Sequence, residues 1–182
     1  MKATGIVRRI DDLGRVVVPK EIRRTLRIRE GDPLEIYTDR EGGIILRKYS
    51  PIGELSQFSK QYAEALAQNT GYIVSITDRD QHIAVAGAGK KDLAKKAISR
   101  QMDTLMNQRE SLLAVKGERK FIPITEDGGE NYTAQVIYPI IAEGDAIGTV
   151  ILTTKDGKVR MGEMEMKLAA SAASFLGRQL EQ

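Results

Sequence analysis

The sequence contains no cysteine and no tryptophan, and it has a single histidine, His82, among its 182 residues. Without cysteine the chain cannot form a disulfide, a thiolate metal site or a cysteine nucleophile. A single histidine would need carboxylates or distant partners to build a metal site or a catalytic triad. The sequence therefore predicts a protein that is not an enzyme and that holds no metal or other cofactor.

Long apolar runs are also missing. No stretch approaches the ~20 apolar residues that a membrane-spanning helix needs, and residues 1–5 lack the apolar core of a signal peptide. The absence of cysteine fits a reducing compartment. These features together predict a cytoplasmic protein without a membrane partner.

Positive charge is unevenly distributed along the chain. Residues 1–50 hold 12 Lys and Arg against 8 Asp and Glu, whereas residues 51–182 hold 16 against 17. A small basic module on a nearly neutral body suggests a polyanionic partner for the module alone. A solvated charged surface would explain the same excess, so the motifs have to decide between the two.

The first fifty residues alternate between short strand patterns and turn chemistry. The turn at residues 11–14 contains two aspartates and a glycine, which favour tight turns. Pro19 suits the first turn of a helix, where its missing N–H costs nothing. The patterns predict strands at residues 4–10, 16–18, 34–38 and 44–49, and a helix at residues 20–26.

This N-terminal segment is too small to bury a core alone. A domain of ~60 residues buries only ~60% of its unfolded surface, and smaller ones need a disulfide, a metal or a partner. Cysteine is absent and the one histidine lies elsewhere. A partner chain remains, so the sequence predicts an obligate homodimer through residues 1–50.

The same segment carries four motifs in a fixed order: Thr4-Gly5-Ile6-Val7-Arg8-Arg9, Leu13-Gly14-Arg15-Val16-Val17-Val18-Pro19, Ile22-Arg23-Arg24-x-Leu26-x-Ile28 and Gly31-Asp32-x-Leu34-Glu35-Ile36. This series resembles the AbrB family of DNA-binding domains. The resemblance implies a dimeric swapped-hairpin β-barrel that exchanges hairpins between chains and belongs to a transcription regulator.

The resemblance also implies which residues contact DNA. By position, the family's DNA-contacting arginines correspond to Arg8, Arg15, Arg23 and Arg24, and the neighbouring Arg9 and Lys20 extend this patch. Arg27 and Arg29 are interpreted as part of a solvated helix end. No aromatic residue lies among the N-terminal arginines before Tyr37, which favours duplex DNA over a stacked single strand.

Residues 56–182, after a linker at residues 51–55, predict a second domain. The pattern gives a helix at 54–69, a hairpin at 72–77 and 82–86, a helix at 90–109, short strands at 112–115 and 121–124, a hairpin at 132–142 and 146–154, and a last helix that ends near residue 182. This order predicts an antiparallel sheet flanked by helices and resembles the GAF fold. The fold class is therefore α+β.

The first and last helices of the second domain both carry an apolar stripe. Such stripes either pair helices between subunits, giving a homotetramer, or simply cover the domain's own sheet. A GAF-like sheet could also hold a small-molecule effector in a pocket, but nothing in the sequence names one, and the alternative is a domain that serves assembly and coupling alone. The acidic pair at residues 78 and 80 falls in a turn, and residues 87–91 lack the full phosphate-loop pattern.

An AbrB-like domain joined to a GAF-like domain is similar to a family of sporulation regulators. The similarity implies a sequence-specific, double-stranded DNA-binding transcription regulator that is associated with the nucleoid and controls late sporulation genes as activator and repressor. The alternative is an antitoxin of a toxin–antitoxin pair, because antitoxins share this N-terminal fold. The nearly neutral, globular pattern after residue 54 argues against the flexible acidic tail of an antitoxin.

Overall fold

The computed structural model describes residues 5–128 and 131–181. They separate into two compact units, an N-terminal unit at residues 1–49 and a C-terminal unit at residues 50–182. Thr4 of the predicted first strand, Gly129 of a predicted loop and Gln182 at the predicted end of the last helix lie outside the described residues. None of the helices in the described ranges combines the length and the apolar character that crossing a membrane requires.

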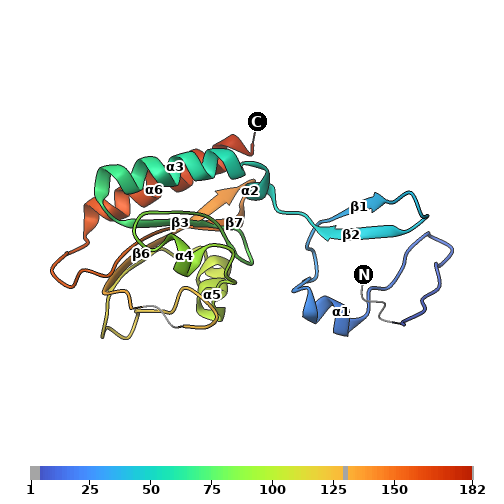
Figure 1. The fold of residues 1–182 in the computed structure, drawn as a ribbon. Coiled ribbons are helices and arrows are strands. Elements are labelled where there is room, and N and C mark those ends of the chain that lie inside the picture. Colours follow the sequence, from blue (N-terminus) through green and yellow to red (C-terminus); the bar gives the residue numbers. More distant parts are fainter. Residues whose placement is uncertain (1–4, 129–130, 182) are drawn as a thin grey trace. The chain divides into compact units, whose positions relative to one another are not determined.

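The N-terminal unit contains one short helix and one hairpin (Figure 1). The helix α1 spans Lys20–Thr25, and strands β1 (Leu34–Thr38) and β2 (Ile44–Lys48) pair antiparallel. The hairpin turn depends on Asp39, whose Oδ1 accepts the backbone N–H groups of Glu41 and Gly43 at 2.9 and 2.7 Å. The predicted helix and the predicted hairpin are therefore confirmed.

The two strands predicted before α1 are wrong for this single chain. Residues 5–10 and 15–18 have no strand assignment, although residues 16–18 are all β-branched valines. A strand needs a neighbouring edge for its hydrogen bonds, and the only sheet in the N-terminal unit's described residues is the β1–β2 hairpin, which does not pair with these segments. These residues have strand propensity, but no strand of the described N-terminal unit pairs with them.

The N-terminal unit has almost no core. Among its described residues only Pro19 is buried, and α1 contains no buried residue. Large apolar side chains lie exposed instead: Ile6, Val7, Ile10, Leu13, Val16, Val17, Leu26, Ile36, Tyr37, Ile44 and Leu46. Val7 is the most exposed of these at 88%. A single copy of this unit therefore leaves in solvent the apolar surface that normally stabilises a fold.

The C-terminal unit is built on a five-stranded antiparallel sheet of order β4-β3-β7-β6-β5. The strands are β3 (Ile73–Thr77), β4 (His82–Ala86), β5 (Leu112–Val115), β6 (Ala134–Ala142) and β7 (Asp145–Thr154). The helices are α2 (Pro51–Glu54), α3 (Ser56–Thr70), α4 (Lys90–Leu93), α5 (Arg100–Gln108) and α6 (Glu163–Gln179). Helices α3 and α6 cover one face of the sheet, and α4 and α5 cover the other (Figure 1). The predicted helix-flanked antiparallel sheet is confirmed.

Alternation along the strands fills two separate cores. Val136 of β6 and its cross-strand partner Leu152 of β7 face α3 and α6. The neighbouring pair Ile137 and Ile151 faces α4 and α5 instead. All four side chains are fully buried. The sheet is thus covered on both faces, as a continuous apolar pattern in its strands requires.

Three local predictions for this unit were wrong. The single helix expected at residues 90–109 is two helices, because the chain between them runs extended and forms isolated bridges at Ala97 and Ile98. Residues 121–124 are not a strand, and Ile124 at their end accepts the backbone N–H of Ser99, at the end of that extended connection. Residues 51–55, expected to be a linker, contain α2, which Ser50 caps and which buries Ile52 completely, so the helix expected to begin at residue 54 begins as α3 at residue 56.

Candidate nucleic-acid interface

Three of the six predicted DNA-binding residues lie on α1. Lys20, Arg23 and Arg24 are separated by three and four positions, a spacing that places side chains on one side of a helix. The helix begins directly after Pro19, whose carbonyl accepts the N–H of Arg23 at 3.0 Å. Lys20 and Arg24 are exposed, whereas Arg23 is half-buried and its Nε is buried without a partner among the described residues.

Arg15 lies in the turn before α1 and is held by Asp11. Oδ1 of Asp11 accepts the backbone N–H groups of Leu13 and Arg15 at 3.0 and 2.7 Å, and its Oδ2 accepts Nε of Arg15 at 2.8 Å. The backbone N–H of Arg15, followed by its side chain, lowers the pKa of Asp11. The Arg15 side chain is still 71% exposed. The turn therefore presents this guanidinium to solvent in a defined orientation.

Arg8 and Arg9 occupy the segment before that turn. Both side chains are exposed, and within residues 5–128 and 131–181 neither makes a hydrogen bond or an ion pair. The six predicted residues thus fall into three groups: the segment pair, the turn arginine and the α1 cations. No hydrogen bond or ion pair within the described residues joins these groups.

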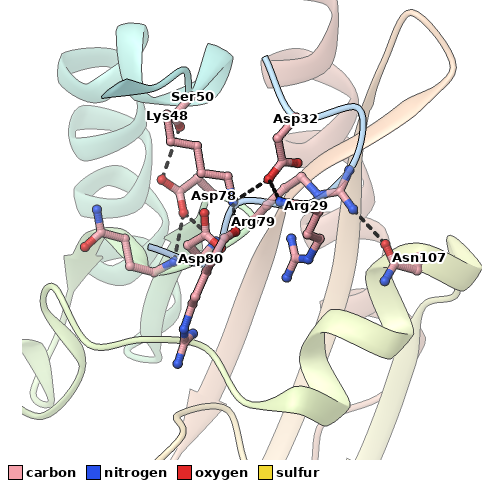
Figure 2. A network of polar contacts seen from close by, with 10 residues as sticks. Arg29, Asp32, Lys48, Ser50, Asp78, Arg79, Asp80 and Asn107 are labelled. Atoms are coloured by element: carbon pink, nitrogen blue, oxygen red, sulfur yellow. Dashed lines mark hydrogen bonds and ion pairs between the residues drawn. The ribbon is translucent and has the colours of Figure 1, made fainter. Parts of the chain in front are cut away.

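A cluster that sequence reasoning missed lies on the C-terminal side of α1. Asp32 accepts the N–H of Arg29 at 2.8 Å and pairs with Nζ of Lys48 at 3.0 Å (Figure 2). Lys48 also donates to the carbonyl of Arg27 at 2.9 Å. Burial alone would raise the pKa of Asp32, but the Arg29 N–H and Lys48 outweigh it and lower that pKa.

This cluster ties the end of β2 to the segment after α1, so it orders the scaffold of the basic unit. Arg27 and Arg29 are half-buried rather than part of a solvated helix end, and Arg27 adopts a left-handed φ of 53°. The sequence signal was weak, because Asp32 and Lys48 lie sixteen positions apart.

The C-terminal unit buries polar side chains on the sheet face toward α5. His82 is 1% exposed, with Nδ1 2.7 Å from Oγ of Ser75 and Nε2 3.3 Å from the carbonyl of Ile124. Burial lowers the pKa of His82 to about 4, so the ring is neutral near pH 7. His82 therefore links the β3–β4 hairpin to the segment that covers it, which is a structural role.

Gln135 of β6 is the unusual member of this face. Its side chain is fully buried, and neither its Oε1 nor its Nε2 has a hydrogen-bond partner in the described part of the chain. It alternates with Val136, which faces the opposite core, and pairs across the sheet with Thr153, whose hydroxyl donates to the carbonyl of Ala134. A buried amide without partners costs free energy, so this position is a candidate for contact with a bound molecule.

The predicted acidic turn of this unit is structural. Asp78 accepts the N–H groups of Asp80 and Gln81 at 2.7 and 2.8 Å and the hydroxyl of Ser50 at 3.1 Å (Figure 2). The acidic pair at residues 78 and 80 therefore belongs to a turn, as predicted. In the ranges that the structure describes, no cluster of three His, Cys, Asp or Glu side chains is arranged to hold a metal.

The outer side of α6 carries an open groove of about 580 Å³. Its lining consists of Ala170, Ser171, Ser174, Phe175, Arg178 and Gln179. Phe175 stacks on Tyr62 of α3 with ring centroids 5.3 Å apart, and Phe58 on the same helix is 52% exposed. The face formed by α3 and α6 therefore leaves aromatic surface in solvent.

Comparison with known proteins gives family matches over both units. Residues 54–181 match the family described as stage V sporulation protein T C-terminal, transcription factor. Residues 7–54 match the family described as antidote-toxin recognition MazE, bacterial antitoxin. The first match covers most of the C-terminal unit, and the second covers the basic unit with its six predicted residues.

Individual relatives point the same way. Stage V sporulation protein T of Bacillus subtilis (strain 168) is 54% identical over 182 residues, covering 100% of both chains. The transition state regulatory protein AbrB of the same organism is 42% identical over 112 residues, covering 62% of this chain and 97% of that protein. The GAF domain of a phosphoenolpyruvate-protein phosphotransferase from Coxiella burnetii is 17% identical with a TM-score of 0.55, covering 69% of this chain and 82% of that one. This last likeness concerns the fold alone and confirms the GAF-like architecture.

Proposed function

The chain belongs to the family of stage V sporulation protein T, and from this membership we propose that it is a transcription regulator that binds specific sites on double-stranded DNA. The observation that carries the proposal is the full-length identity of 54% to that protein, together with a C-terminal family described as a transcription factor. The description of the C-terminal family as a transcription factor points away from catalysis.

The N-terminal unit supplies the DNA contacts in this proposal. Lys20 and Arg24 on α1 and Arg8 and Arg9 before the turn are exposed cations suited to phosphates, which dominate affinity. Arg15 and Arg23 are more constrained, Arg15 by Asp11 and Arg23 by partial burial. Constrained arginines suit base edges in the major groove, because bidentate contacts to guanine need a fixed guanidinium plane.

Binding takes place as a homodimer through residues 1–50. The exposed valines and isoleucines before α1 have strand propensity without an edge, and the β1–β2 hairpin leaves Ile36 and Ile44 exposed. A second copy provides both missing elements, since exchanged hairpins give each segment an edge and a shared core. Dimerisation also doubles the number of cations that face one duplex.

The C-terminal unit assembles and regulates the dimers. The aromatic face of α3 and α6, with its groove, is the surface on which two dimers join into a tetramer, and two barrels in one particle raise avidity. The unpartnered amide of Gln135 supports an effector site on the opposite face of the sheet. The proposed targets are late sporulation genes, both activated and repressed, in a nucleoid-associated cytoplasmic complex.

The antitoxin alternative is not favoured. The N-terminal match to an antitoxin family concerns only residues 7–54, whereas residues 54–181 match a transcription-factor family and form a packed sheet with two cores. An antitoxin tail wraps its toxin as a flexible segment. Co-purification of the chain with a small ribonuclease would reverse this preference.

Salt-titrated binding of the full chain to duplex DNA tests the proposal. We expect Arg15→Ala and Arg23→Ala each to weaken binding by a factor above about ten, because each removes a base contact worth ~1–3 kcal/mol, and to leave the dependence on salt, which reports phosphate contacts, close to that of the parent chain. Arg160→Ala, an exposed arginine of the C-terminal unit, is the matched control. Two N-terminal variants that bind like the parent chain would contradict the assignment.

A further inference from the structure

We propose that Asp11 is a specificity-determining positioning residue, which holds Arg15 so that it reads a base edge instead of attaching to the nearest phosphate. The inference rests on the proposed DNA-binding function. The observation behind it is that the carboxylate of Asp11 accepts both the backbone N–H and the Nε of Arg15, so it shapes the turn before α1 and orients the guanidinium.

The two oxygens of Asp11 have separate tasks. Oδ1 accepts the backbone N–H groups of Leu13 and Arg15, which closes the turn together with the bond from the N–H of Asp11 to the carbonyl of Arg15 at 3.1 Å. Oδ2 accepts only Nε of Arg15, at 2.8 Å. The first task sets the backbone, and the second sets the direction of the side chain.

The bond to Nε leaves the far end of Arg15 available. A guanidinium has five N–H donors, and Asp11 uses the one on Nε; no described residue forms a hydrogen bond or ion pair with the terminal nitrogens Nη1 and Nη2 of Arg15. These two nitrogens are the pair that can address O6 and N7 of guanine together. Arg15 is therefore prepared for a bidentate contact with its plane already fixed.

The negative charge of Asp11 also disfavours phosphate at the same place. A carboxylate 2.8 Å from Nε offsets the cation and would repel a phosphate that approached the pair. Arg8, Arg9 and Arg24 have no acidic partner among the described residues, so they remain suited to phosphates. The unit thus separates base-reading cations from cations that supply affinity for any sequence.

Asp11→Asn separates the two tasks. An asparagine Oδ1 can still accept the two backbone N–H groups and keep the turn, but it removes the charge that holds and offsets Arg15. Asp12→Asn is the matched control, because it removes the same charge one position away and Asp12 makes no hydrogen bond or ion pair within the residues that the structure describes.

The experiment uses the full chain and a library of duplexes with a randomised centre. The parent chain first selects a preferred duplex, and affinities are then measured for that duplex and for a scrambled duplex of equal length and composition, each as a function of salt. We expect Asp11→Asn to lower the ratio of the two affinities about tenfold and to steepen the salt slope by about 0.9, the value for one added phosphate contact.

The outcomes are distinguishable. If Asp12→Asn changes the ratio as much as Asp11→Asn does, or if neither changes it, the positioning role is wrong. A double-mutant cycle with Arg15→Lys, which removes the Nε donor, guards against a general loss of folding. We expect the Asp11→Asn and Arg15→Lys effects on the ratio of the two affinities to be non-additive. Additive effects would overturn the proposal. A parent chain that binds no duplex would contradict the proposed function itself.

Discussion

The two units of this chain differ most in what they bury. The C-terminal unit packs apolar residues on both faces of a five-stranded sheet, whereas the N-terminal unit buries only Pro19 among its described residues. The unit proposed to bind DNA is therefore the one that a single chain stabilises least. This contrast supports the proposal that the fold of the N-terminal unit depends on association, which would bring cations from two chains together on one duplex.

The largest expected effect is the loss of a core leucine in the C-terminal unit. Leu152→Ala removes a fully buried side chain from the core under α3 and α6, and we expect it to lower the free energy of unfolding by about 3 kcal/mol. Leu13→Ala in the N-terminal unit is the matched control, because Leu13 is 70% exposed. Denaturant unfolding at low protein concentration measures both, and equal losses would remove the contrast between the units.

A smaller effect concerns pH in the C-terminal unit. Burial lowers the pKa of His82 from 6.5 to about 4, so between these values the unfolded chain binds a proton that the folded chain does not. Stability is fully present above pH 6.5 and declines as the pH falls toward 4. We expect a loss of about 2 kcal/mol between pH 7 and pH 5.

Denaturant unfolding of the full chain at several pH values measures this loss. The window above pH 5 separates His82 from the carboxylates Asp32 and Glu165, whose pKa values are lowered in the folded chain. Their stabilisation is fully present above the ordinary carboxylate pKa and is lost only as the pH falls below it. His82→Gln, with an amide that does not titrate, should remove the decline. A decline that persists in this variant would assign the pH dependence to other groups.

The smallest effect on a single chain comes from the valine run before α1. Val17 is 71% exposed, so Val17→Thr should change the stability of dilute, monomeric protein by about 0.5 kcal/mol or less. The same substitution should weaken dimerisation about fivefold, because the hydroxyl would be buried in the shared barrel. Sedimentation over a range of concentrations tests this, and an unchanged dimer would place the valines outside the interface.

The sequence predicted the elements whose signals are local. Pro19 marked the start of α1, and alternation located β1, β2 and the sheet of the C-terminal unit. Motifs located the basic residues, because those residues lie in an ordered series along the chain. Local propensity was therefore enough wherever the partner of a segment is a sequence neighbour.

The remaining features depend on partners that sequence patterns do not show. The valines at 16–18 have strand propensity but no edge to pair with in this chain. The residues between α4 and α5 bridge to Gln81 and Thr125 instead of continuing a helix. The sequence indicated only that Asp11 lies in a turn. The position of a carboxylate in a turn does not show which side chain it also binds, so the ion pair with Arg15 was not predicted.

Amide hydrogen exchange of the full chain as a function of protein concentration tests the central claim most directly. We expect the amides of residues 5–10 and 16–18 to exchange freely in dilute monomer and to become protected over the concentration range in which dimers form. The amides of β3 and β7 should be protected throughout. Protection of residues 5–10 and 16–18 at the lowest concentration, in a chain shown to be monomeric, would contradict the account.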